Sequence, residues 1–299
     1  MYDARGSSQP VAGGLGFGLA VIGVVTVVFF AILNMPSMTG PGKSPVEKTA
    51  ADTAPETTLF TTFEDEATRD YIAALRETFP SAASDLEDAV RKASARGADR
   101  VELGLLVLQA GASDIATSAG RLARADVEHV NALLDLSQTA LQDLSRSGAP
   151  YCKGSDLIHF ASLSEQQLYS AVFDRVGHGA GLYEFGLELN TILLDAIRDA
   201  RASPVLHGQL SAPDQQALQR LGLAVMTDPQ IVRLLTTEGK SRSEMDAVMR
   251  DVNFCDLGVK ILGRVDELPD TTKGRVWAEA MRQIESGNWR YTLYRYTGY

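Results

Sequence analysis

"LYEFGLELNTILLDAIRDA", residues 182–200, is the stretch that decides the fold class. It is strongly amphipathic, and apolar residues spaced three and four apart give a helix one face to bury. It follows the glycine-rich segment 177–181 and ends before Pro204, so helix-breaking residues flank it on both sides. We therefore expect a long helix here, with one face in a core.

Signals of the same kind recur on both sides of this stretch, and strand patterns hardly appear. Each predicted helix start has a short polar residue that can cap the first turn. The predicted starts are Thr62 with Asp65, Ser84 with Glu87 as a capping box, Asp99, Asp126, Ser164 with Gln167, Ser211 before Pro213, and Asp228 before Pro229. The last two helices are expected over residues 244–265 and 273–284. This pattern predicts an all-α, multi-helix globular domain over residues 59–288.

Composition excludes several classes of protein. The chain has 299 residues and a net charge of −10, with 45% hydrophobic and 22% charged residues, which is ordinary for a globular protein. Binding to nucleic acid requires clustered Lys and Arg that release counterions, and no basic run offers them. We therefore expect no nucleic-acid partner.

An uninterrupted apolar run lies near the N-terminus. Between Arg5 and Lys43 there is no charged side chain, and from Val11 to Leu33 only Thr26 is polar. A helix of this length measures roughly 35 Å, enough to cross a hydrocarbon core of about 30 Å. A cleaved signal has a shorter apolar region and ends in a small-x-small site, which "AILNMPSMTG" lacks. The sequence predicts a short tail over 1–10 and a transmembrane anchor over 11–34.

Two glycines in the predicted anchor have the spacing of a helix-packing motif. Gly14 and Gly18 form GxxxG, which lets two membrane helices approach closely and would allow a homodimer. Glycine is also common in membrane helices for other reasons, so both interpretations stay open. The anchor has no ionisable residue, which argues against a channel or transporter.

The segment after the anchor predicts where the domain is held. Residues 35–58 are rich in Pro, Thr, Ala and Ser and have no hydrophobic period, which is typical of an extended linker. Lys and Arg flank the anchor almost equally, so the positive-inside rule does not decide the topology. The linker composition favours a single-pass protein of the cytoplasmic (inner) membrane with its domain in the periplasm or otherwise outside the cytoplasm.

Cys152 and Cys255 are the only cysteines and lie 103 positions apart. In an oxidising compartment this count predicts one disulfide, whereas in the cytoplasm two buried thiols are expected. Their isolation does not fit the paired spacing of a zinc site, so we expect no metal and no cofactor.

The best local candidate for catalysis is the stretch "GHGAGLYEFGLELN". It places His178 in a glycine-rich segment, with Glu184 and Glu188 one helical turn apart. A histidine with two carboxylates could support acid–base hydrolysis in a cleft, but the same glutamates suit a solvated helix face. No GxSxG elbow, P-loop or strand-linked GxGxxG accompanies them.

The C-terminal tail, residues 289–299, concentrates aromatic and arginine side chains. Trp, Tyr and Arg are enriched at interface hot spots because they combine contact area with a polar group. The candidate partner-binding residues are Trp289, Arg290, Tyr291, Tyr294, Arg295 and Tyr296. The tail could instead pack on its own domain or stack on sugar rings. We expect a membrane-anchored interaction or assembly module at the cell envelope, with an envelope hydrolase using His178 and the two glutamates as the alternative.

Overall fold

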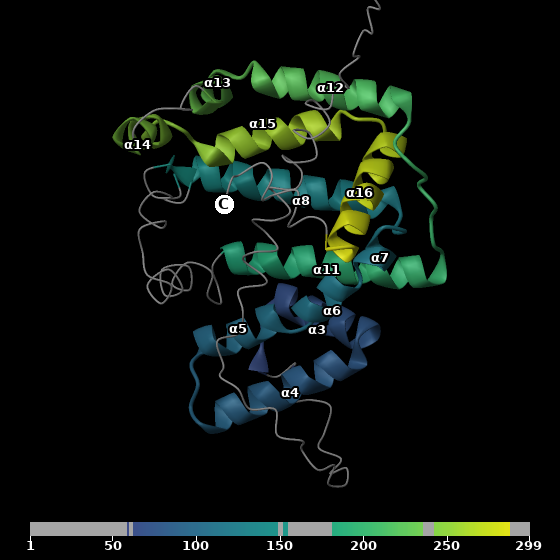
Figure 1. Ribbon diagram of the computed structural model, residues 1–299. Coiled ribbons are helices and arrows are strands. Elements are labelled where there is room, and N and C mark those ends of the chain that lie inside the picture. The colour runs from purple at the N-terminus through teal and green to yellow at the C-terminus, as the bar shows by residue number, and fades with distance from the viewer. Residues whose placement is uncertain (1–58, 60–61, 149–151, 155–180, 236–241, 288–299) are drawn as a thin grey trace, which may run out of the picture.

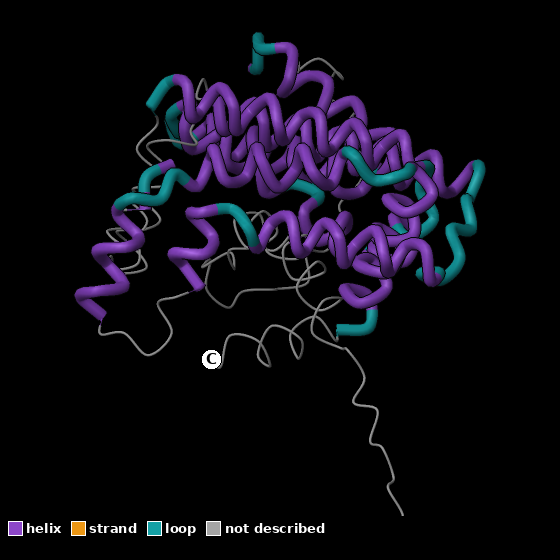
Figure 2. Tube along the Cα trace, turned by 90° about the horizontal axis from the view of Figure 1, so that it is seen from above, coloured by secondary structure: helices purple, strands orange, loops and turns teal. Residues whose placement is uncertain are grey.

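The computed structural model of the chain describes residues 59, 62–148, 152–154, 181–235 and 242–287. In this part of the chain every regular element is a helix, as Figure 2 shows, and the isolated β-bridge joins Lys153 to Asn253. The prediction of an all-α fold is therefore confirmed for the described residues. None of the described helices combines the length and the apolar composition that crossing a bilayer requires.

Several predictions fall on residues outside the described part. These are the tail 1–10, the anchor 11–34 with Gly14 and Gly18, the linker 35–58, the helix start at Ser164 with Gln167, His178, and the C-terminal residues 289–299. They stay predictions from the sequence alone.

The described helices are short to medium in length. In chain order they are α3 (Glu66–Thr78), α4 (Pro80–Ala95), α5 (Arg100–Gln109), α6 (Ala112–Thr117), α7 (Ala119–Leu122), α8 (Val127–Arg146), α11 (Gly181–Ala202), α12 (Ala212–Met226), α13 (Pro229–Leu235), α14 (Arg242–Arg250), α15 (Phe254–Asp266) and α16 (Asp270–Glu285).

The longer helices stack in layers. From one end of the molecule to the other, α12 packs on α15, α15 on α8, α8 on α11, α11 on α3, and α3 on α4 (Figure 1). Helix α16 crosses this stack and contacts both α8 and α7. Residues 182–200, in α11, thus lie between the two halves of the molecule, which explains their large buried face.

Two apolar cores lie on either side of α8. The larger core joins α3, α4, α5, α11 and part of α16, and includes Tyr71, Leu75 and Leu194, each fully buried. The smaller core joins α12, α13, α15 and α16 around Leu218. Helix α8 contributes Leu133 to the rim of the larger core and Leu134 to the rim of the smaller one. Because each side of α8 meets a different core, the helix links the two.

Most predicted caps are confirmed. The side chains of Asp99 and Asp126 accept hydrogen bonds from the backbone N–H groups of the first turns of α5 and α8, over 2.8 and 2.9 Å. Asp228 accepts one from Gln230 at the start of α13, over 2.8 Å. The predicted cap Thr62 is wrong: α3 begins at Glu66, and its cap is Asp65, which accepts from the N–H of Thr68 over 2.8 Å. These local bonds satisfy donors that a helix start otherwise leaves without partners.

Two further details of the predicted helices are wrong. The capping box at Ser84 does not form, because α4 already begins at Pro80 and Ser84 is an exposed residue inside the helix. Proline suits a first helical position, where its missing N–H needs no partner. The expected helix 244–265 is two helices, since α14 ends at Arg250 and Asn253 caps a new helix by accepting from Cys255 N and Asp256 N, both over 3.1 Å.

Candidate functional site

The two cysteines meet at the start of α15. Cys152 and Cys255 lie at disulfide bonding distance with their Cα atoms 5.0 Å apart, and they are 2% and 4% exposed. Leu141 and Leu144 of α8 pack against them. The predicted pairing is confirmed, and it fastens the chain after α8 to the first turn of α15.

Backbone contacts reinforce this junction. Lys153 forms the antiparallel bridge with Asn253, and the N–H of Gly154 donates to the carbonyl of Val252 over 3.0 Å. A Cβ atom on Gly154 would overlap the carbonyl oxygen of Met249. Only glycine therefore allows the chain to approach the α14–α15 turn this closely.

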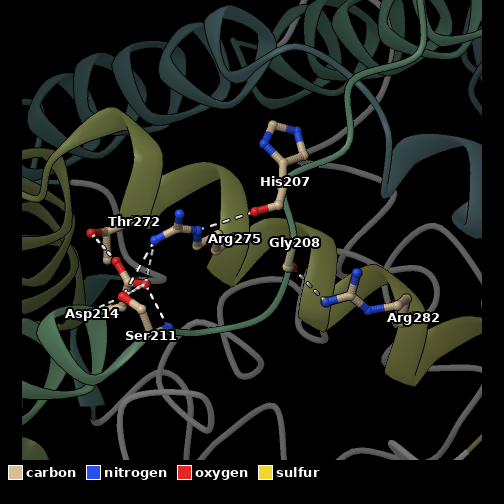
Figure 3. A network of polar contacts seen from close by, with 7 residues as sticks. All are labelled: His207, Gly208, Ser211, Asp214, Thr272, Arg275 and Arg282. Carbon is tan, nitrogen blue, oxygen red and sulfur yellow. Dashed lines mark hydrogen bonds and ion pairs between the residues drawn. The ribbon is translucent and has the colours of Figure 1, made fainter.

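A polar network forms at the start of α12 and is drawn in Figure 3. Asp214 is 3% exposed, and its Oδ2 accepts hydrogen bonds from the backbone N–H and the hydroxyl of Ser211, over 2.7 and 2.5 Å. The N–H of Asp214 donates back to the Ser211 hydroxyl over 3.4 Å. Together they form a reciprocal capping box at the predicted helix start.

Helix α16 completes the coordination of the Asp214 carboxylate. Thr272 donates from its hydroxyl to Oδ1 over 2.7 Å, and Arg275 donates from Nη1 to Oδ2 over 2.8 Å. Burial opposes ionisation of Asp214, but the hydrogen bonds from Ser211, Thr272 and Arg275 outweigh it and hold its pKa well below the usual range. The carboxylate is therefore a charged structural centre between two helices.

The connection before α12 is tied to the same helix. Arg275 donates from Nε to the carbonyl of His207 over 3.1 Å, and Arg282 donates to the carbonyl of Gly208 over 3.4 Å. The His207 ring lies over Gly274, where a Cβ atom would come within 2.5 Å of Nδ1. These contacts hold the segment between α11 and α12 against α16.

Serine, histidine and aspartate occur together here without the geometry of a nucleophilic triad. The Ser211 hydroxyl bonds directly to Asp214, while Nε2 of His207 lies 2.7 Å from the carbonyl oxygen of Ala125. Figure 3 shows the imidazole turned away from the serine. A triad requires the imidazole between the hydroxyl and the carboxylate, so these three side chains do not form one.

The predicted catalytic glutamates lie on the exposed strip of α11. Tyr183 and Leu187 are fully buried, whereas Glu184 and Glu188 are exposed. Partial burial and the neighbouring Glu184 carboxylate raise the pKa of Glu188. The structure thus places both carboxylates on one helix face, and His178 lies outside the described residues.

Among the described residues, no group of three or more His, Cys, Asp and Glu side chains could hold a metal ion. A hollow in this part of the chain is lined by Thr62, Phe63, Glu64, Arg100 and Leu103. None of these residues belongs to the predicted catalytic or partner-binding sets.

Two features of the structure have no local signal in the sequence. One is the contact of Asp214 with Thr272 and Arg275, which lie 58 and 61 positions away, so that only the local Ser211 cap was visible. The other is the outer face of α12 and α13, where Leu223 is 68% exposed and Val232 is 43% exposed. Surface apolar residues are signalled by no local motif, because their exposure depends on which side of the helix faces the core.

Comparisons of the chain with protein-family models, with curated proteins and with solved structures found no match.

Proposed function

We propose that this protein is a single-pass membrane protein whose helical domain is an interaction or assembly module outside the cytoplasm. The membrane part of the proposal rests on the apolar run from Val11 to Leu33, which has no charged residue. The linker 35–58 separates that run from the domain by a segment suited to an extended spacer.

The proposed location of the domain outside the cytoplasm rests on the pairing of Cys152 with Cys255. Two cysteines that are 103 positions apart, and the only ones in the chain, lie at bonding distance in a folded domain. Disulfides persist in oxidising compartments and are rare where thiols are kept reduced. A bonded pair supports a domain on the outer side of the cytoplasmic membrane.

The interaction role rests on the tail and on the surface charge. Residues 289–299 hold Trp289, four tyrosines and two arginines, a composition enriched at protein-binding hot spots. An acidic domain with a short cationic aromatic tail offers two surfaces of opposite charge for assembly. A protein partner that binds the tail is the expected ligand.

Cross-linking in intact membranes tests the proposal. Replacing Trp289, Tyr291 and Tyr294 by Ala should remove the cross-linked complex, because the aromatic contacts supply most of the binding energy. Replacing Thr292 and Thr297 by Ala is the matched control and should leave the complex intact. A complex unchanged by the aromatic substitutions would overturn the role of the tail.

The hydrolase alternative predicts a different result. Replacing Glu184 and Glu188 by Gln should abolish function in a cell-based assay if the glutamates are catalytic, and change little if the domain is a scaffold. Both side chains are exposed, so these substitutions should preserve the fold. Loss of function with normal folding would favour the enzyme.

A further inference from the structure

Helices α12 and α13 form the outermost layer of the stack (Figure 1), and three of their large apolar side chains are exposed. Leu223 is 68% exposed, Met226 39% and Val232 43%. Leu223 and Met226 are three positions apart on α12 and therefore share a side of the helix. The other large exposed apolar residues of the described part, Val101 and Leu206, lie on different elements. Exposed apolar side chains that share one side of a helix, as Leu223 and Met226 do, can mark an interaction site.

The same layer presents no free acidic group to solvent, although the chain is acidic. Residues 212–235 hold two acids, Asp214 and Asp228. Asp214 is buried against Arg275, and Asp228, with a side chain 16% exposed, accepts from Lys260 over 2.8 Å. The exposed charges of these helices are Arg220 and Arg233. This face can therefore approach another protein surface without carboxylate repulsion.

We propose that the outer face of α12 and α13, centred on Leu223, is where two copies of this chain meet. In a two-fold dimer the same patch covers itself, so the apolar side chains of each copy cover those of the other. Gln215, Gln216 and Gln219 are exposed beside the patch and supply neutral hydrogen-bonding groups for its rim.

Charge favours this pairing over other contacts between copies. With a net charge of −10 on each chain, most surfaces of two copies repel each other. Helices α3 and α4, at the other end of the stack, hold six acidic and four basic residues. Joining two copies through α12 and α13 puts these acidic ends farthest apart. For antiparallel helices crossing near Leu223, the two Arg220 groups lie about 12 Å apart, beyond the Debye length of about 8 Å.

Cysteine cross-linking of the full chain tests the contact. Cysteines are placed one at a time at positions 219, 223 and 226, and Ser94→Cys on the exposed face of α4 is the control. Mild oxidation of the protein in detergent should give a covalent dimer from at least one of the three α12 positions and none from Ser94→Cys. Equal cross-linking at all four positions, or none at α12, would overturn the proposal.

Light scattering of the same preparation separates this face from the anchor. Leu223→Arg should convert a species of twice the chain mass to the mass of one chain, while Arg91→Glu on α4 should not. The double variant Gly14→Leu and Gly18→Leu should remain dimeric. The α12 contact would be contradicted if the glycine variant lost the dimer while Leu223→Arg kept it. It would also be contradicted if the wild type were monomeric at every concentration. A dimer lost to Leu223→Arg only when lipid is present would assign the face to the membrane instead.

This inference extends the proposed assembly role and can fail independently of it. Alkaline extraction of membranes reports the anchor alone, whatever the oligomeric state. A chain that stays in the membrane but does not dimerise through α12 would refute the dimer and leave the proposed function standing.

Discussion

Arg275 of α16 donates a hydrogen bond from Nη1 to Oδ2 of Asp214 in α12 over 2.8 Å. The two residues are 61 positions apart in the sequence, and their contact joins the two helices. The same guanidinium donates from Nε to the carbonyl of His207, so one side chain holds both α12 and the segment before it. The smaller core depends on this alignment, because α12 and α16 both contribute to it.

Removing the charge of Asp214 should destabilise the domain. Asp214→Asn leaves the buried hydroxyl of Thr272 and the partly buried Arg275 without their carboxylate, at a cost of about 2 to 4 kcal/mol. Asp143→Asn, which loses an exposed pair with Arg146, is the matched control and should cost less than about 1 kcal/mol. Urea denaturation measures both, and equal losses would contradict the structural role of Asp214.

The same carboxylate should make stability depend on pH. The pKa of Asp214 is held below its unfolded value of about 3.9, so its contribution is present at neutral pH and is lost as the pH falls below that value. The free energy of unfolding of the wild type should therefore fall more steeply between about pH 5 and pH 2 than that of Asp214→Asn. Parallel curves for the two proteins would show that Asp214 is not linked to acid unfolding.

Replacing each of two helical glycines by alanine should change the stability of the domain in opposite directions. Gly274→Ala brings a Cβ atom within 2.5 Å of the His207 ring, which also contacts the Ala125 carbonyl, so this substitution should destabilise. Gly263→Ala meets nothing within 4 Å and should stabilise by about 0.5 to 1 kcal/mol through helix propensity. Thermal unfolding of both variants checks the contact, and stabilisation by both would mean that the ring is free to move.

Breaking the bond between Cys152 and Cys255 should lower stability substantially. Closing a loop of about 100 residues stabilises by up to about 4.7 kcal/mol through loop-closure entropy, and measured values are often smaller. Replacing both cysteines by Ala should lower the urea midpoint, and reductant should lower that of the wild type but not that of the double variant. A wild-type midpoint insensitive to reductant under unfolding conditions would show that the thiols are not bonded.

Features set by neighbouring residues could be predicted from the sequence. Asp99, Asp126 and Ser211 cap helices because their side chains reach the backbone of the next turn, a contact that needs no tertiary partner. The break between Arg250 and Phe254 contains no Gly or Pro, and its one local signal is Asn253, whose side chain caps the start of α15. The helix predicted from Ser84 begins four residues earlier, because Pro80 can occupy the first helical position, where its missing N–H needs no partner.

Features set by distant residues could not be predicted. The glutamates at 184 and 188 share a helix face as expected, but the face turned to α3 holds Tyr183, which hydrogen bonds to Thr68, and not the glutamates. Asn190, on the same helix, is 1% exposed, and neither polar atom of its side chain has a partner among the described residues. The sequence shows the period of a helix but not which neighbour each side will meet.

Topology is the most direct test of the central claim, a membrane-anchored domain outside the cytoplasm. Ser94 is exposed on α4, so Ser94→Cys offers a thiol that a membrane-impermeant maleimide can reach while Cys152 and Cys255 stay buried. Intact cells expressing the full chain should be labelled at position 94 as strongly as lysed cells. Labelling that appears only after lysis would place the domain in the cytoplasm and refute the proposed topology.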